Sequence, residues 1–351
     1  MEKDCNIDLT PFKLLGQGVK GSAYKVDVDI KKIFQDADIT EFITVPYVIK
    51  DTDISPEKKH SRKEIEPYFH HCLINNLVDD YGTNDFSKCL FKQYYYTVCK
   101  NNIYTVLPLF EKYTLSKVFN KVNSETLLFC HFAILFTIGM YQSYNLVHND
   151  LHLNNIFLEK VDEKLKNKIA CFEFKSKKFY FPLKNIQYIP KIGDWGMACR
   201  YSKKGTQQIC YADNLSKKAA LCNDVLRVIA RFYSVTIFNN LSALRKKQLA
   251  DINGDNRDYR VETVLPNSLI KFLQQHYFIT PLNNYIYFSH TDVKQALTQI
   301  LSNILKYRTT VYTAFDYFNN LKNGEWGDIS SPSKGDGSDK ENIIVLGRIT
   351  K

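Results

Sequence analysis

The 351-residue sequence lacks the features that mark membrane and secreted proteins. No apolar run approaches the roughly 20 residues that a helix needs to span a bilayer. The first ten residues, M-E-K-D-C-N-I-D-L-T, contain acids and no apolar signal core. We therefore expect no membrane partner and no secretory signal.

Cysteine pairs of the C-x-x-C kind are also missing, although the chain has nine cysteines. Cys199, Cys210 and Cys222 are too widely spaced for a compact zinc knuckle. The number of cysteines is odd, so reduced thiols are the simplest interpretation. This predicts a cytoplasmic or nuclear location.

The composition is that of a globular protein, with 44% hydrophobic and 24% charged residues and no internal repeat. The formal net charge of +10 favours anionic partners such as nucleotides, acidic protein segments or nucleic acid. Charge alone does not choose among these partners.

One stretch, residues 146–158, organises the rest of the sequence. It reads L-V-H-N-D-L-H-L-N-N-I-F-L, a polar loop between the end of an apolar helix and an apolar strand. Asp150 with Asn155 five residues later is the arrangement that accepts a hydroxyl proton and holds magnesium in phosphoryl transfer. The alternative is an ordinary polar turn, because Asp and Asn are common turn formers.

A glycine cluster lies near the N-terminus. Apolar and polar residues alternate on both sides of Gly16, Gly18 and Gly21, which predicts two strands joined by a tight turn. A G-x-G-x-x-G loop lets backbone N–H groups approach phosphates without interference from Cβ atoms. A dinucleotide fingerprint needs a helix directly afterwards, whereas residues 22–26 continue as a strand, which suits a flap over a nucleotide better. The alternative is a glycine-rich hairpin turn.

Residues 45–50 form a short β-prone run that ends in Lys50. A lysine in this position, downstream of a glycine flap, can reach the α- and β-phosphates. A helix is predicted within 61–78, where Glu64 is our candidate to pair with Lys50 and Glu66 is the rival. Alternatively, both acids are exposed residues of a first helical turn, favoured there by the helix dipole.

Two more strands are predicted at 91–99 and 101–107, and the chain then reads L-P-L-F. A hinge between two lobes would lie here. Proline lacks an N–H group, so backbone groups of its neighbours Leu107 and Leu109 would meet an adenine edge.

A basic insertion with strand-like pieces follows the central loop, and its lysines favour a solvated face over a nucleic-acid site. Asp194 then begins D-W-G after a short strand and is a second acid positioned to bind metal; the alternative is a β-turn. Residues 197–222 show little periodicity and predict an activation or substrate-facing loop. Asp224 either caps a helix or reaches back to the 146–158 loop by backbone hydrogen bonds.

Residues 124–145 predict a long buried helix, and residues 223–238 resume a helical pattern. Further helices are expected at 241–250, 266–277, 291–306 and 309–321. Residues 322–342 are rich in glycine, serine and charge, so we expect residues 322–351 to form a disordered tail. The sequence assigns no docking place to the apolar I-I-V-L within that tail.

The glycine flap, Lys50, Glu64, H-N-D-L-H-L-N-N, D-W-G and Asp224, taken in order, resemble the protein-kinase superfamily from about residue 12 to residue 320. E-x-x-x-Y at 64–68 and T-L-S-K-V-F at 114–119 look like the casein kinase 1 and vaccinia-related kinase branch. The strand insert that ends in Y-I-P-K-I-G-D-W-G looks like protein kinases of large DNA viruses, which would place the protein in the host cell or the virion.

The resemblance implies an α+β, bilobal protein-kinase-like fold. Its small β-rich N-lobe would comprise residues 1–107, and its larger, mainly helical C-lobe residues 108–321, with 322–351 as the tail. ATP and Mg²⁺ are the cofactors that such a fold implies.

The same resemblance implies a role for each matching residue. Asp150 would orient and deprotonate the acceptor hydroxyl, while Asn155 and Asp194 would hold magnesium. His148 and Asp224 would brace the catalytic loop. The residues expected to bind the nucleotide are Gly16, Gln17, Gly18, Gly21, Ala23, Lys50, Glu64, Leu107 and Leu109.

Three positions depart from the family pattern. Asn149 stands where many protein kinases have an arginine that meets a phosphate on the activation loop, which predicts activity without loop phosphorylation. His152 stands where Ser/Thr kinases usually have a lysine, and histidine is partly neutral at pH 7. There is no A-P-E, and Tyr211-Ala212-Asp213 is the stand-in before Asp224.

The function implied is that of an ATP-dependent serine/threonine protein kinase, which transfers the γ-phosphate of Mg-ATP to a protein hydroxyl. The alternatives are a small-molecule phosphotransferase of the aminoglycoside or choline kinase type, favoured by D-L-H, and a pseudokinase that serves as a binding scaffold. Nucleic acid is not expected as the primary partner, since that role rests on net charge alone.

Overall fold

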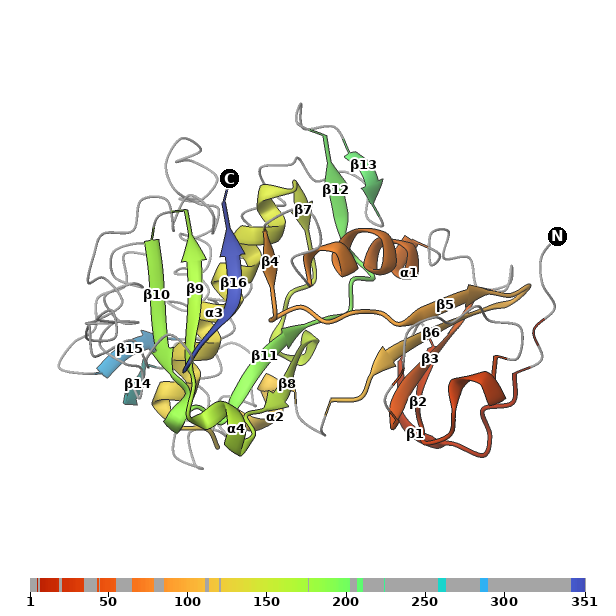
Figure 1. The fold of residues 1–351 in the computed structure, drawn as a ribbon, viewed down its shortest axis with the longest axis horizontal. Helices are drawn as coiled ribbons and strands as arrows, with labels where there is room; N and C mark the ends of the chain where they lie inside the picture. Colours follow the sequence, from red (N-terminus) through yellow and green to blue (C-terminus); the bar gives the residue numbers. More distant parts are fainter. Residues whose placement is uncertain are drawn as a thin grey trace.

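The computed structural model has a mixed α/β architecture with a β-rich region and few helices in its described part (Figure 1). Most of residues 5–210 are described, with gaps; of the later residues only position 224 and three short strands are. The described residues are 5, 7–18, 21–34, 43, 45–54, 65–78, 85–110, 114–119, 121–175, 177–202, 207–210, 224, 258–262, 285–289 and 342–350.

The N-terminal part is a five-stranded antiparallel sheet of order β1-β2-β3-β6-β5 (Figure 1). Alternating β-prone residues form these strands, as the sequence predicts, and the sheet buries Val26, Tyr47, Ile49 and Val106 on one face. The bounds are β1 Lys13–Gly18, β2 Gly21–Val26, β3 Tyr47–Asp53, β5 Tyr95–Val98 and β6 Asn102–Pro108, with a short 3₁₀ helix, η1 Ile30–Lys32.

The helix predicted within 61–78 is present from residue 65 onward. It begins as α1 (Ile65–Phe69), continues as the π-helix η2 (His70–Ile74) and ends as the 3₁₀ helix η3 (Asn75–Leu77). Pro67 lies in the first turn, where its missing N–H group leaves no hydrogen bond unmade.

Helix α3 (Ser124–Ser143) is the long buried helix predicted from the sequence. The side chain of Asn123 caps it by accepting a hydrogen bond from the backbone N–H of Thr126 at 2.8 Å. By length and composition α3 could cross a membrane, contrary to the expectation that no segment is that apolar, yet 94% of its most apolar window is buried inside the protein. A helix that is apolar all round is typical of a protein core.

A four-stranded sheet of order β10-β9-β16-β4 packs beside α3 (Figure 1). Its strands are β4 Phe86–Ser87, β9 Ile169–Phe174, β10 Lys177–Pro182 and β16 Ile343–Ile349. The tail prediction was therefore wrong for Ile343–Ile349, whose apolar side chains pair between β9 and β4 instead of remaining disordered.

The same sheet crosses the predicted boundary at residue 107. Strand β4 precedes that boundary in sequence but pairs with β16 from the far end of the chain. The segment that contains β4 thus packs with the C-terminal part of the protein.

Shorter elements complete the described structure. Within 197–222, which we expected to be a loop, β12 and β13 pair with each other, and β12 also pairs with β7. The helices expected after residue 223 lie outside the described residues, apart from position 224. The remaining elements are α2 Leu115–Val118, β7 Leu146–Val147, η4 Leu153–Asn155, β8 Ile156–Lys160, α4 Glu163–Lys166, η5 Leu183–Asn185, β11 Tyr188–Ile192, β12 Cys199–Tyr201, β13 Gln207–Cys210, β14 Asp258–Glu262 and β15 Tyr285–Ser289.

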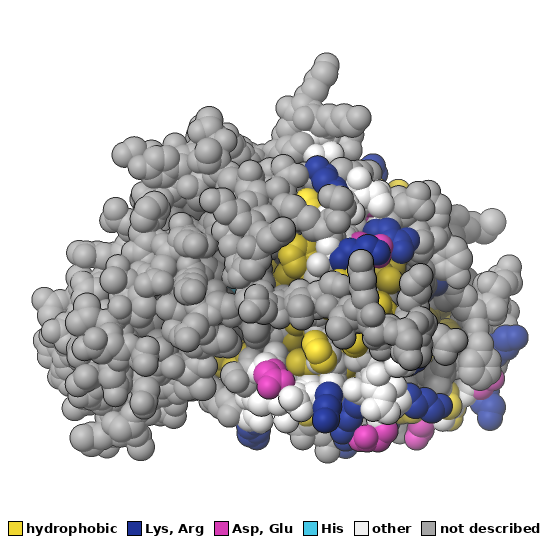
Figure 2. Space-filling model, turned by 60° about the vertical axis from the view of Figure 1, so that its left-hand side comes forward, with side chains coloured by type: hydrophobic (Ala, Val, Ile, Leu, Met, Phe, Trp, Pro, Cys, Tyr) yellow, Lys and Arg dark blue, Asp and Glu magenta, His cyan; other side chains and the backbone are white. Residues whose placement is uncertain are grey.

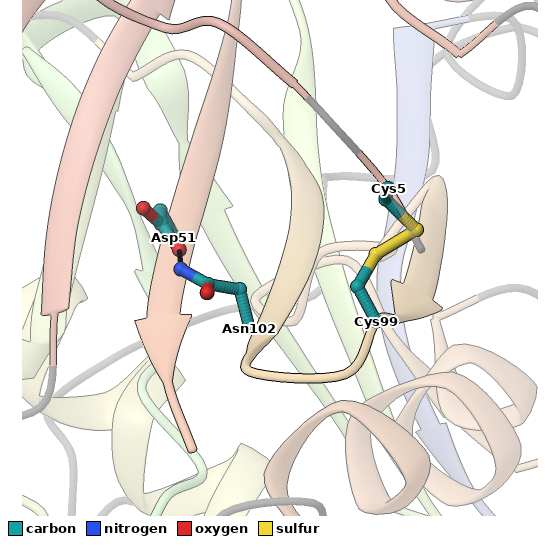
Figure 3. The surroundings of a disulfide bond; sticks show 4 residues. All are labelled: Cys5, Asp51, Cys99 and Asn102. Carbon is teal, nitrogen blue, oxygen red and sulfur yellow. Dashed lines mark hydrogen bonds between the residues drawn. A yellow bond between two sulfur atoms is a disulfide. The ribbon is translucent and has the colours of Figure 1, made fainter. Parts of the chain in front are cut away.

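A disulfide joins Cys5 to Cys99 and fastens the N-terminal segment to the turn between β5 and β6 (Figure 3). Cys199 is also disulfide-bonded. The expectation that the thiols are all reduced was therefore wrong. Sequence spacing could not reveal the Cys5–Cys99 pair, because 94 positions separate two residues whose Cα atoms the fold brings to 5.5 Å.

One face of the molecule shows how its charge is arranged. In Figure 2, the lysine and arginine side chains drawn along the lower edge lie next to aspartate and glutamate side chains. On this face, among the residues that are coloured, the positive charge is mixed with negative charge, as on an ordinary solvated surface.

Candidate active site

Two carboxylates converge on the amino group of Lys50. The Nζ atom of Lys50, in β3, lies 2.6 Å from Oε1 of Glu66 in α1 and 3.6 Å from Oδ1 of Asp194, just after β11. Burial alone would lower the pKa of Lys50, but Glu66 and Asp194 outweigh it and raise that pKa above its ordinary value. The lysine therefore stays charged at every physiological pH.

The acid that pairs with Lys50 is Glu66, the rival of Glu64 among the two acids that the sequence suggests. Glu64 itself lies outside the described residues. The helix is described from Ile65, so Glu66 occupies its first turn, where the helix dipole also favours a negative charge.

The loop that carries Asp150 is organised by hydrogen bonds. The side-chain Nδ2 of Asn155 donates to the backbone oxygen of Asp150 at 2.9 Å, and the backbone N of Asn155 donates to His152 O at 2.8 Å. The backbone oxygen of Asn155 accepts from the N–H of Gly193 at 3.0 Å, which joins this loop to the residue before Asp194. Asp150 and Asp194 therefore lie on two loops held side by side.

Asp224 holds the same loop through hydrogen bonds from the loop's backbone N–H groups. Its fully buried carboxylate accepts hydrogen bonds from the backbone N–H groups of His148 at 2.7 Å and Asn149 at 2.8 Å, and from the hydroxyl of Tyr141 at 2.9 Å. Burial raises the pKa of Asp224, while the charge of His148 and these hydrogen bonds oppose the rise. Of the two interpretations made from the sequence, the one that ties Asp224 to the loop by backbone hydrogen bonds is confirmed.

Left-handed backbone conformations mark both loops. Asn149 has φ +62° and Asp194 has φ +61°, a region that residues other than glycine rarely adopt and that Asn and Asp tolerate best. The side-chain Nδ2 of Asn149 donates to Met197 O at 3.2 Å, so it links the Asp150 loop to the segment after D-W-G. Such conformations persist where surrounding contacts impose them, which is common at functional sites.

An aromatic cluster lies behind the two loops. The indole of Trp195 is 1% exposed, packs 4.6 Å from the ring of His148 and stacks 6.0 Å from Phe69, which ends α1. The ring Nε2 of His148 donates to the carbonyl of Gly193 at 2.9 Å. These contacts fix the helix of Glu66, the Asp150 loop and the Asp194 loop to one another.

The glycines of the flap differ in what they require. Gly21 has φ +154° and a Cβ there would collide with the carbonyl oxygen of Asp51, so the fold itself demands glycine. A Cβ at Gly16 would meet no atom within 4 Å, and one at Gly18 only the carbonyl of Gly21 at 4.0 Å. The open space at Gly16 and Gly18 is compatible with a phosphate approaching the backbone.

The other residues predicted to bind a nucleotide lie on the same sheet. Gln17 pairs with Ser22 in the β1–β2 hairpin, and Ala23 lies opposite Lys50 across β2 and β3. Leu107 lies near the end of β6 and Leu109 just beyond it, where the chain leaves the sheet. Both leucines are half-buried.

His152 adds a contact that the sequence did not predict. Its Nε2 atom lies 3.7 Å from Oδ2 of Asp150, and the two side chains are 32% and 36% exposed. A protonated imidazole there would form an ion pair with the carboxylate. The D-L-H spacing hints at this contact only to the extent that residues two apart in an extended segment point to one side.

Oxygen ligands for a divalent cation are available at Asn155 and Asp194. Because Asn155 uses its Nδ2 on the Asp150 carbonyl, its Oδ1 remains an acceptor with no donor among the described residues. Amide and carboxylate oxygens suit Mg²⁺, which keeps several waters and needs few protein ligands. No group of three or more His, Cys, Asp or Glu residues that could hold a metal occurs in the described part of the chain. No family model matches this chain, and no curated protein matches it.

Proposed function

We propose that the protein is an ATP-dependent serine/threonine protein kinase with a bilobal, protein-kinase-like fold. The observation that carries the proposal is the convergence of Glu66 and Asp194 on Lys50, beside the loop that presents Asp150 and Asn155. Phosphoryl transfer needs placed charges more than covalent chemistry, and this cluster supplies them.

Each side chain then has a defined task. Lys50, kept protonated by its two carboxylates, binds the non-transferred phosphates, and Glu66 holds it in place. The backbone of the β1–β2 hairpin covers the phosphates, since glycines there leave room for close approach. Asn155 and Asp194 would hold Mg²⁺, which supplies charge neutralisation at the phosphates.

Asp150 acts on the acceptor. Its carboxylate, 36% exposed, can accept the proton of an incoming serine or threonine hydroxyl and orient its oxygen. The hydrogen bonds that the Asp224 carboxylate accepts from the backbone N–H groups of His148 and Asn149 keep this loop in place before the acceptor arrives. Preorganisation of this kind spares the reaction the cost of ordering the loop.

A second candidate is a small-molecule phosphotransferase. The observation that favours it is His152 beside Asp150, because a histidine in place of lysine changes the charge that faces the transferred phosphate and the acceptor. A pseudokinase is the third candidate, although the charged groups that transfer needs are all present in the chain.

The test is a transfer assay with γ-labelled ATP and Mg²⁺. The purified protein is incubated with a protein extract in one arm and with a panel of amines and alcohols in the other, and acceptors are mapped by mass spectrometry. We expect phosphoserine and phosphothreonine in the protein arm only. Label in the small-molecule arm alone would favour the second candidate, and ATP binding without transfer in either arm would favour the third.

A further inference from the structure

The C-terminal strand β16 occupies the interior of the sheet beside α3. It runs parallel to β9 and antiparallel to β4, with Ile343 opposite Ile169 at one end and Arg348 opposite Phe86 at the other. In Figure 1 β16 lies between β9 and β4, although it is far from both strands in sequence. A strand in this position has both edges paired, so its removal would expose two edges of the sheet.

Specific contacts hold this strand against β4. The backbone N–H of Lys88 donates to Leu346 O at 2.7 Å, and the N–H and hydroxyl of Thr350 both donate to Oδ1 of Asp85 at 2.6 Å. Asp85 is fully buried, and its other oxygen accepts from the hydroxyl of Tyr144 at 3.2 Å. A buried carboxylate needs such donors, since an unpaired buried charge is strongly destabilising.

The fit around the strand is close at Gly347. A Cβ at that position would lie 2.8 Å from the ring of Phe136 and 3.2 Å from the ring of Phe172, both within the core. A larger residue at this position would force the ring of Phe136 in α3 to shift. The space between β9, β4 and α3 therefore favours a strand that has glycine at position 347.

The segment that pairs with β16 through β4 also contacts the residues just before Asp194. We call residues 85–93 the linking strip. Within it, the carbonyl of Cys89 accepts from Ile192 N at 2.8 Å, and the carbonyl of Lys88 accepts from Lys191 Nζ at 2.6 Å. A Cβ on Gly193 would lie 2.5 Å from the ring of Phe91, so the strip also packs directly against the residue before Asp194.

The other end of the linking strip is bonded to the helix of Glu66. The carbonyl of Phe91 accepts from His70 Nε2 at 2.9 Å, and the side-chain Nε2 of Gln93 donates to the carbonyl of Pro67, the residue after Glu66, at 3.1 Å. Asn75 and Gln93 exchange two further hydrogen bonds of 2.8 Å each. One strip thus contacts β16, the Asp194 loop and the Glu66 helix.

We propose that β16 is a positioning element of the candidate active site, which acts through Asp85 and the linking strip to hold Glu66 and Asp194 on Lys50. The proposal rests on the proposed function and adds to it a segment of the same chain, β16, that holds the site in place. When β16 is paired with β4, the first half of the linking strip is fixed in place. The strip then holds the Glu66 helix and the Asp194 loop where both acids can reach Lys50. When β16 leaves, the strip loses its partner strand and the two donors that Thr350 gives to Asp85.

The experiment begins with the full chain, folded first. A specific protease site is placed within residues 325–335, the purified protein is cleaved there, and the released C-terminal fragment is washed away. Three quantities are then compared before and after release: phosphoryl transfer, hydrogen exchange of residues 66–77 and 88–93, and acylation of Lys50 measured by mass spectrometry.

We expect release to increase acylation of Lys50 at least threefold, because its amino group, in a side chain only 24% exposed while it pairs with Glu66 and Asp194, becomes accessible to the reagent when the two carboxylates move away. Exposed Lys32 is the internal control and should react as before. Exchange in both segments should accelerate. Transfer should fall at least tenfold and return when a synthetic peptide of residues 341–351 is added, whereas the same peptide with Gly347→Leu should restore nothing.

The full-chain variant Gly347→Leu provides a second test that needs no cleavage. If it folds, it should show the same gain in Lys50 acylation and the same faster exchange as the cleaved protein. Unchanged Lys50 acylation in both proteins would overturn the proposal and leave β16 as a structural strand only. Absence of transfer before cleavage, together with a gain in Lys50 acylation after it, would support the positioning role and refute the kinase function.

Discussion

The ammonium group of Lys50 lies 3.6 Å from the carboxylate of Asp194, although the first residue belongs to the N-terminal sheet and the second follows a strand of a different sheet. Lys50 lies within β3, and Asp194 lies two residues after the end of β11. Their approach explains how one nucleotide could touch both parts of the protein at once.

Removal of either member of this pair should abolish phosphoryl transfer. Lys50→Met loses the charge that binds phosphates, and Asp194→Ala loses a ligand for the cation, so each should lower turnover by at least 10³-fold, the order expected when a placed charge is lost. The measurement is kcat with γ-labelled ATP. Lys32→Met, which alters an exposed lysine on η1, is the matched control and should keep normal turnover. Near-normal turnover in either active-site variant would contradict the assignment.

Glu66 and Glu64 offer a direct comparison of the two acids that the sequence suggested. We expect Glu66→Gln to raise the KM for ATP and lower kcat/KM by about 10–10²-fold, because it removes a charged partner 2.6 Å from Lys50. Glu64→Gln should resemble the unaltered protein. The opposite order, with Glu64→Gln the more damaging change, would show that the 2.6 Å ion pair is not the one that matters for nucleotide binding.

Asp150→Ala tests the proposed base separately from nucleotide binding. We expect kcat to fall by a factor on the order of 10²–10⁴, as for the loss of a positioned general base, while the Kd for ATP changes little. The measurements are single-turnover transfer and equilibrium nucleotide binding. Glu163→Gln, at an 86% exposed side chain, is the control. A loss of ATP binding in the Asp150 variant would assign this residue to the nucleotide and not to the acceptor.

The elements that the sequence predicted well are those whose pattern is local. The alternation around Gly21 and the uniformly apolar run of α3 each specify one element without reference to the rest of the chain. The link from Asp224 to the backbone of His148 was predicted only as one of two alternatives, because an Asp near the start of a predicted helix is equally compatible with a helix cap.

The elements that the sequence did not predict depend on distant partners. The sequence predicts a tail where the structure has β16, because the partners of this strand, β9 and β4, lie far away in sequence and its own apolar run is short. The choice between Glu64 and Glu66 as the partner of Lys50 depends on which side of the helix faces β3, and the 2.6 Å contact that shows Glu66 to be the partner joins residues 16 positions apart. Both features depend on contacts between segments that are separated in sequence, which the hydrophobic periodicity of one segment does not report.

Stability should fall in acid because of a buried histidine. Burial lowers the pKa of His70 to about 4; its hydrogen bond to Phe91 opposes this, and the charges of Lys50, His71 and His148 add to it. Below about pH 6.5 His70 binds a proton in the unfolded chain, whereas in the folded protein it stays neutral until about pH 4. The contribution of His70 to the free energy of unfolding should therefore be constant above about pH 6.5 and fall between pH 6.5 and 4, by on the order of 3 kcal/mol.

The control for that pH dependence is the neighbouring residue. His70→Gln should flatten the decline between pH 6.5 and 4, whereas His71→Gln, at an exposed position, should reduce it only slightly, because the charge of His71 is a minor cause of the lowered pKa of His70. Urea unfolding at a series of pH values measures both. A decline that is equally steep in all three proteins would assign the acid sensitivity to other groups, such as His131, whose pKa burial lowers to about 3.

The Cys5–Cys99 disulfide should stabilise the N-terminal sheet by restricting the unfolded chain. It closes a loop across a sequence separation of 94, and cross-links of this span contribute roughly 2–5 kcal/mol, mainly through the entropy of the unfolded state. Cys5→Ser and Cys99→Ser should each lower the free energy of unfolding by a similar amount, and the double variant by no more than either single one. Cys72→Ser, which alters a free and half-buried thiol, should change it little. Measured by denaturant unfolding with and without reductant, the two single variants should also lose their sensitivity to reduction at this site. If reductant destabilises them as much as it does the unaltered protein, the dominant cross-link lies elsewhere, and Cys199 is the residue to examine next.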